Sequence, residues 1–234
     1  MLAVEAIDSF YGAAHVLQGI SLQVPAGAIV ALLGRNGAGK STTLRSILGI
    51  VRVRAGRVLL GQEEITGLAC DAVARRGVAF VPEERGVIPN LTVAENLRLG
   101  IIGSGGQREA GRRLDRALGY FPALKPLLHR RGGLLSGGEQ QMLSIARAVA
   151  AAPRLMLVDE PTEGLSPLIA AAVVEGLRRI NGEGTAILLV EQNLEVAQSL
   201  ARQVYVIDQG QVRFEGPPDA LARDAALTQA LLGV

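Results

Sequence analysis

The stretch Gly34-Arg-Asn-Gly-Ala-Gly-Lys-Ser-Thr42 decides the fold of this chain. It fits the pattern G-x-x-x-x-G-K-[ST], with Gly34, Gly39, Lys40 and Ser41 at the fixed positions. An apolar run, residues 28–33, precedes it, and an amphipathic segment, residues 43–48, follows it. This order predicts a strand, a glycine-rich loop and a helix, which is the context that the pattern requires.

The residue types of this loop indicate phosphate binding. Glycines let the backbone curl so that its N–H groups point inward at an anion, and the next helix adds its positive N-terminus. Lys40 is expected to reach the β- and γ-phosphates, and the Ser41 hydroxyl to ligate Mg²⁺. A plain turn is the alternative, and the match at all four fixed positions disfavours it. We therefore expect a nucleoside triphosphate to contact Gly34, Arg35, Asn36, Gly37, Ala38, Gly39, Lys40, Ser41 and Thr42.

Composition limits the class of protein. The 234 residues are 49% apolar but only 3% aromatic, which suits a parallel sheet buried by helices on both faces. The net charge of +2, from 24 basic and 22 acidic residues, is too balanced to indicate a nucleic-acid surface. Cys70 is the single cysteine, which fits a reducing compartment, and we expect it to be small and buried. His15 and His129 are isolated, so no metal site is assigned to them.

The chain carries no signal of membrane insertion. Its N-terminus lacks the basic region of a signal peptide, and no apolar run approaches the roughly 18–20 residues of a membrane span. We expect a soluble chain, cytoplasmic and, where it works at a membrane, peripheral on the inner face.

The element order is α/β with an interruption. Strands are predicted over 2–7, 20–24, 28–33, 56–60, 77–81, 155–159, 185–190, 204–208 and 212–215. Asp71 is predicted to cap a helix that runs to Arg76, and Thr92 with Glu95 forms a capping box that starts another. The middle of the chain lacks a strong strand pattern and indicates an inserted helical segment. Residues 219–232 are predicted to be one helix.

Two carboxylates follow the apolar strand Leu155–Asp159. Asp159, at the end of a strand beside the glycine loop, is suited to hold Mg²⁺. Glu160 is suited to polarise the attacking water as general base. Paired acids after an apolar strand are common by chance. This pattern therefore indicates a nucleotide site only because the same chain also has the phosphate-binding loop with Lys40.

A second anion-binding pattern lies in Leu-Ser-Gly-Gly-Glu-Gln-Gln, residues 135–141. Ser136, Gly137 and Gly138 open a predicted helix whose N-terminus attracts phosphate, although an ordinary capped helix has the same residues. Two phosphate-binding loops for one phosphate chain favour a head-to-tail dimer. In it, each ATP lies between one molecule's Gly34–Thr42 loop and the other's Ser136–Gly138 loop.

With these motifs the sequence resembles the ATP-binding-cassette family over essentially the whole chain. The resemblance implies a P-loop, RecA-like and mostly parallel sheet with an N-terminal antiparallel β-subdomain. It implies a single domain over 1–234, with an α/β core over 1–82 and 153–234 and a helical subdomain over about 83–152 that includes the signature motif. It also implies an ATPase whose dimer closes on ATP, and it places Tyr11 where the family has an aromatic that stacks on adenine.

Departures from the family pattern narrow the resemblance. Glu83 follows a Val-Pro pair where Gln is usual, near Mg²⁺ and the lytic water. Gln192 stands where a catalytic His usually contacts the γ-phosphate, and Ser166 stands where Asp is usual. The variants VPE-x-R, LLVEQN and GLSP are similar to those of the smaller ATPase subunit of branched-chain amino acid importers. That implies polytopic permease subunits, a second ATPase subunit as homo- or heterodimer, and indirectly a binding protein.

Three alternatives stay open at this point. Importers of urea and short amides have similar variants, so the substrate is less firmly assigned than the class. A soluble cassette ATPase of the iron–sulfur assembly type fits the length. A nucleotide-binding regulator with slow turnover fits Glu83 and Gln192, because an amide cannot carry the positive charge of an imidazolium.

Overall fold

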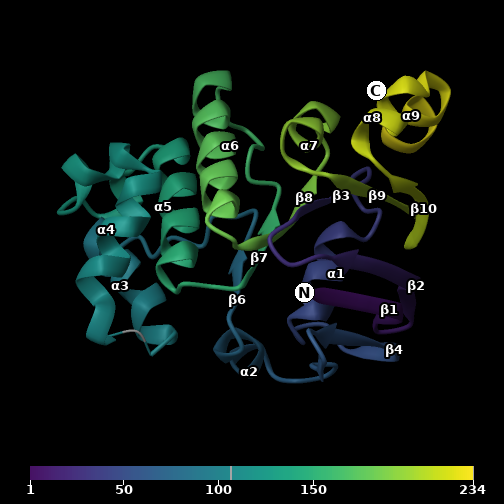
Figure 1. Cartoon of the computed structure of the whole chain (residues 1–234), viewed down its shortest axis with the longest axis horizontal. Helices are drawn as coiled ribbons and strands as arrows, with labels where there is room; N and C mark the ends of the chain where they lie inside the picture. The colour runs from purple at the N-terminus through teal and green to yellow at the C-terminus, as the bar shows by residue number, and fades with distance from the viewer. Residues whose placement is uncertain (106, 234) are drawn as a thin grey trace. The chain divides into compact units, whose positions relative to one another are not determined.

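The protein is described by a computed structural model that covers residues 1–105 and 107–233. Its backbone contacts divide it into two compact units. Unit 1 comprises Met1–Arg76 with Ala186–Val234, and unit 2 comprises Gly77–Thr185. Figure 1 colours the chain from the N-terminus to the C-terminus. Each unit is described by itself below.

Unit 1 contains an antiparallel sheet formed by the start of the chain. Leu2 and Val4 are buried two residues apart, as on one face of a strand, and after the register shift between Val4 and Ile7 the buried positions continue at Ile7 and Ser9. The strand order is β2-β1-β4-β5, with β1 (Leu2–Tyr11), β2 (Ala14–Val24), β4 (Val53–Leu60) and β5 (Glu63–Glu64). The first two strands are longer than predicted, because they continue as a hairpin up to the two-residue turn at Gly12 and Ala13.

The second group of strands in unit 1 is mostly parallel. Every residue of β3 (Ile29–Leu33) and β8 (Ala186–Glu191) is buried, so both strands have apolar runs without alternation. β3 pairs in parallel with β8 and with β9 (Gln203–Asp208), and β10 (Gln211–Gly216) pairs antiparallel with β9. The helices of this unit are α1 (Lys40–Ile47), α2 (Cys70–Arg75), α7 (Leu194–Leu200), α8 (Pro218–Arg223) and α9 (Ala225–Leu232).

Unit 2 is built mainly from helices. They are α3 (Val93–Gly103), α4 (Ala110–Tyr120), α5 (Gly137–Ala150) and α6 (Pro167–Gly182), with short 3₁₀ turns over Gln107–Glu109, Pro122–Leu127 and Gly132–Leu134. Its strands β6 (Val78–Val81) and β7 (Leu155–Asp159) pair in parallel. In Figure 1, α5 lies between α6 on one side and α3 with α4 on the other. α3 approaches α5 so closely at Gly100 that an added Cβ would lie 2.1 Å from the Arg147 carbonyl oxygen.

Three sequence predictions about local structure are wrong. Ala69, not Asp71, is the N-cap of α2, and Asp71 instead pairs with Arg75 one turn later at 2.8 Å. Cys70 is exposed, because it opens this short helix on the surface. The C-terminal helix is two helices, separated at Asp224, whose carboxylate accepts a hydrogen bond from the Leu227 N–H at 2.9 Å. That side-chain cap starts α9 afresh.

Candidate nucleotide site

The glycine loop of unit 1 runs from the end of β3 to the first residue of α1, as predicted. Gly34, Gly37 and Gly39 have φ values of 156°, 80° and 115°, which disfavour residues with a Cβ. A Cβ at Gly34 would lie 2.3 Å from the Ile207 carbonyl oxygen, and one at Gly39 would lie 2.9 Å from Leu17 Cδ2. The loop therefore curls tightly over β9 and β2, a path that only glycine permits at these two points.

The first turn of α1 is suited to an anion. Its N-cap is Gly39, and no side chain forms a cap hydrogen bond there. Lys40 is only 4% exposed, and its Nζ donates to the carbonyl oxygens of Gly34 at 2.8 Å and Arg35 at 3.1 Å. The loop thus combines an ammonium group, a helix N-terminus and a cradle that a Cβ would fill, a donor set that fits the phosphates of ATP.

Tyr11 and Gln192 also lie in unit 1. Tyr11 is the last residue of β1 and is 46% exposed, so its ring is accessible. Gln192 directly follows β8, and its backbone N–H donates to Glu191 Oε2 at 3.2 Å. Asn193 then caps α7, accepting from the N–H groups of Glu195 and Val196. This cap fixes the turn on which Gln192 is carried.

The carboxylates Asp159 and Glu160 lie in unit 2, at the end of β7. They are only 2% and 7% exposed, and such deep burial is rare for acidic residues. Glu160 has a φ of 42°, in the left-handed region. For a residue with a Cβ this backbone costs on the order of 1–2 kcal/mol. Such strain is typical of functional positions, where the surrounding structure enforces it.

The predicted signature loop opens α5 in unit 2. Ser136 is the N-cap, and its Oγ accepts from the Glu139 N–H at 3.3 Å, while Glu139 Oε2 accepts from the Ser136 N–H at 2.7 Å. A Cβ at Gly137 would lie 2.8 Å from Arg85 Nη1, and one at Gly138 would lie 2.6 Å from Ile169 Cγ2. Both glycines therefore make room for neighbouring side chains at this helix N-terminus.

Glu83 lies in unit 2 on an exposed turn after β6. The Arg85 N–H donates to the Pro82 carbonyl at 3.1 Å, and the Gly86 carbonyl accepts from Arg147 Nη1 at 2.7 Å. Arg85 has a φ of 64°. This turn explains how Arg85 comes to lie against Gly137.

The predicted residues thus fall into two sets. Unit 1 carries Tyr11, the Gly34–Thr42 loop and Gln192, and unit 2 carries Glu83, Ser136–Gly138, Asp159 and Glu160. Within residues 1–105 and 107–233, no cluster of three or more His, Cys, Asp or Glu side chains is arranged to hold a metal ion. Over the same residues, no helix has the length and apolar character needed to cross a membrane.

Three residues with a part in the site were missed by sequence reasoning. Glu139 completes a capping box, which the spacing Ser-x-x-Glu could have revealed. Asn193 before α7 is a capping signal of the same kind. The position of Arg85 against Gly137 depends on a left-handed backbone, for which the sequence has no signal.

Comparisons with known proteins found relatives over the full length of the chain. A protein-family model described as "ABC transporter" matches residues 17–163. The chain is similar to the high-affinity branched-chain amino acid transport ATP-binding protein BraG of Pseudomonas aeruginosa, with 38% identity and full coverage of both chains. It is 34% identical to a probable branched-chain amino acid transport ATP-binding protein of Archaeoglobus fulgidus, over 100% of this chain and 99% of that protein. A lipopolysaccharide export ATP-binding protein of Escherichia coli is 31% identical, over 99% of this chain and 97% of that protein.

Solved structures agree as well. A structure described as the ATP-binding subunit of an ABC transporter superposes with a TM-score of 0.85 and 31% identity, over 100% of this chain and 96% of that one. A nucleotide-free ATP-binding cassette from an ABC transporter gives a TM-score of 0.88 at 25% identity, over 98% and 97% of the two chains.

Proposed function

The chain belongs to the ABC transporter family as one of its ATP-binding, ATP-hydrolysing cassettes, and from that premise we propose that it energises an importer of branched-chain or other hydrophobic amino acids. The observation that carries the proposal is the end-to-end likeness to two ATP-binding proteins of branched-chain amino acid transport. The 31% identity to the lipopolysaccharide export protein is lower over the same length.

The residues of the glycine loop bind and orient the triphosphate. Tyr11 stacks on adenine, the N–H groups of the Gly34–Thr42 loop surround the phosphates, and Lys40 neutralises charge on the β- and γ-phosphates. Lys40 is buried in the loop, which favours this role because a buried ammonium is oriented before ATP arrives.

The remaining residues manage the metal and the water. Ser41, Glu83 and Asp159 offer hydroxyl and carboxylate oxygens, the ligand type that Mg²⁺ prefers. The ion, when bound, offsets the charge that develops on the phosphates. Glu160 takes the proton from the attacking water, and the Gln192 amide donates a hydrogen bond to the γ-phosphate.

ATP closes a dimer in this proposal. The Ser136–Gly138 loop of one copy, or of a second ATPase subunit, binds the phosphates held by the glycine loop of the other. A helical subdomain over about 83–152 transmits the closure to permease subunits at the inner face of the membrane. Residues 89–95, near the start of this subdomain, form the turn that faces the permease in this proposal and the capped start of α3.

Hydrolysis tests the proposal when the chain is expressed together with the permease subunits that the proposal requires. The wild type is expected to hydrolyse ATP, and transported amino acid with its binding protein is expected to stimulate it. Glu160→Gln is expected to bind ATP with unchanged affinity, lose turnover and accumulate as an ATP-bound dimer.

Two results would contradict the proposal. Turnover of the wild type no higher than that of Glu160→Gln would instead identify a nucleotide-binding regulator. Stimulation by urea or short amides, and not by branched-chain amino acids, would keep the importer class and change its substrate.

A further inference from the structure

The end of the β1–β2 hairpin carries Tyr11. The two strands pair Tyr11 with Ala14 and Phe10 with His15 across the turn. Because successive side chains of a strand point to opposite faces, Phe10 lies on the face away from Tyr11. The contacts of Phe10 therefore determine how firmly the Tyr11 side of the hairpin is held.

Three side chains from three strands stack at this point. The rings of Phe10 and His15 lie 4.1 Å apart between centroids, with an interplanar angle of 7°. The guanidinium carbon of Arg54, from β4, lies 4.4 Å from the centroid of the Phe10 ring. Arg54 Nη2 also donates to the Gly12 carbonyl at 3.3 Å, on the residue after Tyr11. The stack and this hydrogen bond tie the turn to β4.

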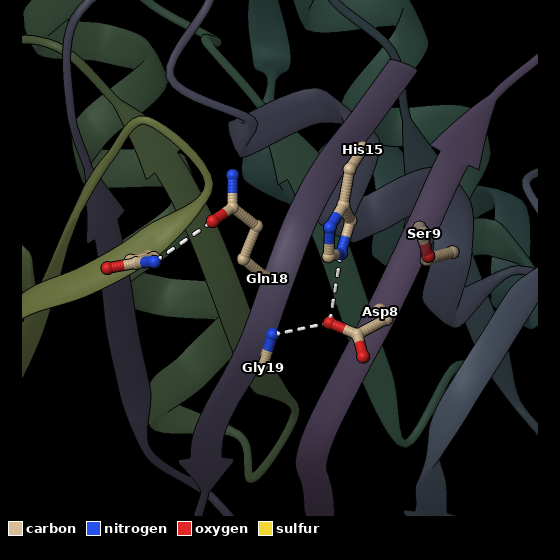
Figure 2. Close-up of polar contacts among 7 residues, drawn as sticks. Asp8, Ser9, His15, Gln18 and Gly19 are labelled. Atoms are coloured by element: carbon tan, nitrogen blue, oxygen red, sulfur yellow. Dashed lines mark hydrogen bonds and ion pairs between the residues drawn. The ribbon is translucent and has the colours of Figure 1, made fainter. Parts of the chain in front are cut away.

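Asp8 holds the histidine of the stack. Its Oδ1 accepts from His15 Nε2 at 3.1 Å and from the Gly19 N–H at 2.8 Å, as Figure 2 shows. One carboxylate oxygen thus joins a side chain and the backbone of β2. This pair of contacts fixes the orientation of the His15 ring.

Irregular pairing brings these residues together. Between Ser9 and Phe10 the partner on β2 changes from Leu17 to His15, and between Asp8 and Ser9 the partner on β4 changes from Ala55 to Val53. One residue is therefore extra on each neighbouring strand, Val16 on β2 and Arg54 on β4. A bulge redirects the side chain that it carries, which explains why Arg54 reaches the Phe10 ring.

The same part of the hairpin is attached to the glycine loop. Ser9 is completely buried, and its Oγ forms a 2.9 Å hydrogen bond with Ser46 Oγ of α1. Leu17 Cδ2 occupies the space that a Cβ at Gly39 would need, at 2.9 Å. The strands that carry Tyr11 thus pack directly on the segment that holds the phosphates.

We propose that Asp8, Phe10, His15 and Arg54 are positioning residues for the nucleotide base, which fix Tyr11 relative to the Gly34–Thr42 loop. The inference rests on the proposed role of Tyr11 as the side chain that stacks on adenine. Stacking of a base on an aromatic ring contributes roughly fivefold to hundredfold in affinity. That contribution is largest when the ring is ordered before binding, since less conformational entropy is then lost.

Calorimetry with two probes tests the proposal. Mg-ATP reports the base and the phosphates, and Mg-tripolyphosphate reports the phosphates alone. We expect His15→Ala and Arg54→Ala to lower the affinity for Mg-ATP roughly threefold to tenfold and to leave the affinity for Mg-tripolyphosphate unchanged. KM for ATP is expected to rise by the same factor at constant kcat. His15→Phe, which keeps a ring on Phe10, is expected to recover most of the loss.

Two controls separate positioning from general damage. Arg57→Ala removes another exposed arginine of β4, which pairs with Glu5, and is expected to change neither affinity. In a Tyr11→Ala background, His15→Ala is expected to cause no further loss, because its effect acts through Tyr11.

Each other outcome overturns a stated part. If Tyr11→Ala leaves ATP affinity unchanged, the role of Tyr11 in the proposed function fails, and the inference with it. If Tyr11→Ala lowers the affinity for ATP but His15→Ala and Arg54→Ala do not, the positioning role fails while the proposed role of Tyr11 stands. Equal losses for ATP and tripolyphosphate, or additive losses with Tyr11→Ala, also overturn it.

Discussion

Gln192 follows the buried strand β8 at the position proposed to face the γ-phosphate. Its amide donates a hydrogen bond without charge, whereas a protonated imidazole would donate a charge-assisted one that is about twice as strong. Gln192→His is therefore expected to raise kcat by roughly fivefold near pH 6. The gain should shrink as the pH rises above about 6.5, where an ordinary imidazole loses its proton.

A pH–rate profile of the variant and the wild type measures this effect. Gln192→Asn keeps the amide and adds no titrating group. The ratio of its rate to that of the wild type should therefore stay constant between pH 6 and pH 8. A rate for Gln192→His at or below that of the wild type at every pH would contradict the expectation.

Two glycines of the phosphate loop differ in the space that they leave for a Cβ atom. At Gly34 a Cβ would lie 2.3 Å from a backbone oxygen, that of Ile207, whereas no atom lies within 4 Å of a Cβ at Gly37. Gly37→Ala is expected to cost only the strain of its φ of 80°, about 1 kcal/mol. Gly34→Ala is expected to cost more than about 3 kcal/mol, because β9 must shift.

Urea unfolding of the two variants gives these free energies. The pair is matched in residue type, substitution and motif, so the comparison isolates the contact with Ile207. Equal destabilisation of the two variants would mean that the loop does not need its close approach to β9.

Helices α3 and α5 approach each other at Gly100. A Cβ there would lie 2.1 Å from the Arg147 carbonyl oxygen, which belongs to the backbone of α5 and cannot rotate away. Gly100→Ala is expected to destabilise the protein by about 1–3 kcal/mol, as overpacking does. Gly119→Ala in α4, where no atom lies within 4 Å, is expected to stabilise it by up to about 1 kcal/mol. Thermal unfolding that shows the same sign for both would refute this.

The start of α3 depends on the charge of Glu95. Its carboxylate accepts hydrogen bonds from the Thr92 N–H and Oγ, both at 2.7 Å, and these lower its pKa. A carboxyl group with a lowered pKa stabilises the fold above its unfolded value of about 4.3 and loses that contribution as the pH falls further. The first turn of α3 is therefore expected to fray on acidification below that value.

Hydrogen exchange at the Thr92 amide follows this fraying, once corrected for the intrinsic rate. In the wild type, protection should fall on acidification. Glu95→Gln keeps an acceptor oxygen but does not titrate, so its protection should stay constant over the same range. If protection in the wild type stays constant as well, the ionised Glu95 carboxylate does not stabilise this cap.

The elements that sequence reasoning predicted best are those whose signal is local. The glycine loop, the capping box at Thr92 and the buried strand β7 each follow from neighbouring residues. The hairpin of β1 and β2 was underestimated, because three register shifts between Val4 and Phe10 interrupt the alternation on which strand prediction depends. The break at Asp224 was missed because an aspartate within a helical pattern gives no sign of whether it caps.

The candidate site shows the same division between local and distant information. The position of the glycine loop between β3 and α1 could be predicted, because the glycine pattern is contiguous in sequence. The stack of Phe10, His15 and Arg54 could not, because Arg54 reaches it from a distant strand. The left-handed backbone of Glu160 could not either, because nothing in the sequence indicates it.

For the molecule as a whole, nucleotide binding and stability are linked. A ligand that binds only the folded chain adds about 2.7 kcal/mol at a hundred times its Kd. For a chain of this size each kcal/mol raises Tm by about 2–4 °C, so saturating Mg-ATP is expected to raise it by about 5–10 °C. Lys40→Ala, which removes a buried ammonium group from the loop, is expected to lose most of this shift.

Thermal unfolding with and without Mg-ATP measures the linkage. Arg57→Ala, on the surface of β4, serves as the control and should keep the full shift. A full shift in Lys40→Ala would mean that ATP binds elsewhere.

The exposure of Tyr11 has an optical consequence. The chain contains no tryptophan and only three tyrosines, so its intrinsic fluorescence comes from tyrosine alone. Tyr120 and Tyr205 are 4% and 3% exposed, whereas Tyr11 is 46% exposed, so a quencher dissolved in the solvent reaches chiefly Tyr11. An adenine ring stacked on Tyr11, as proposed, would shield it, and the protein would then carry a label-free reporter of its own nucleotide occupancy.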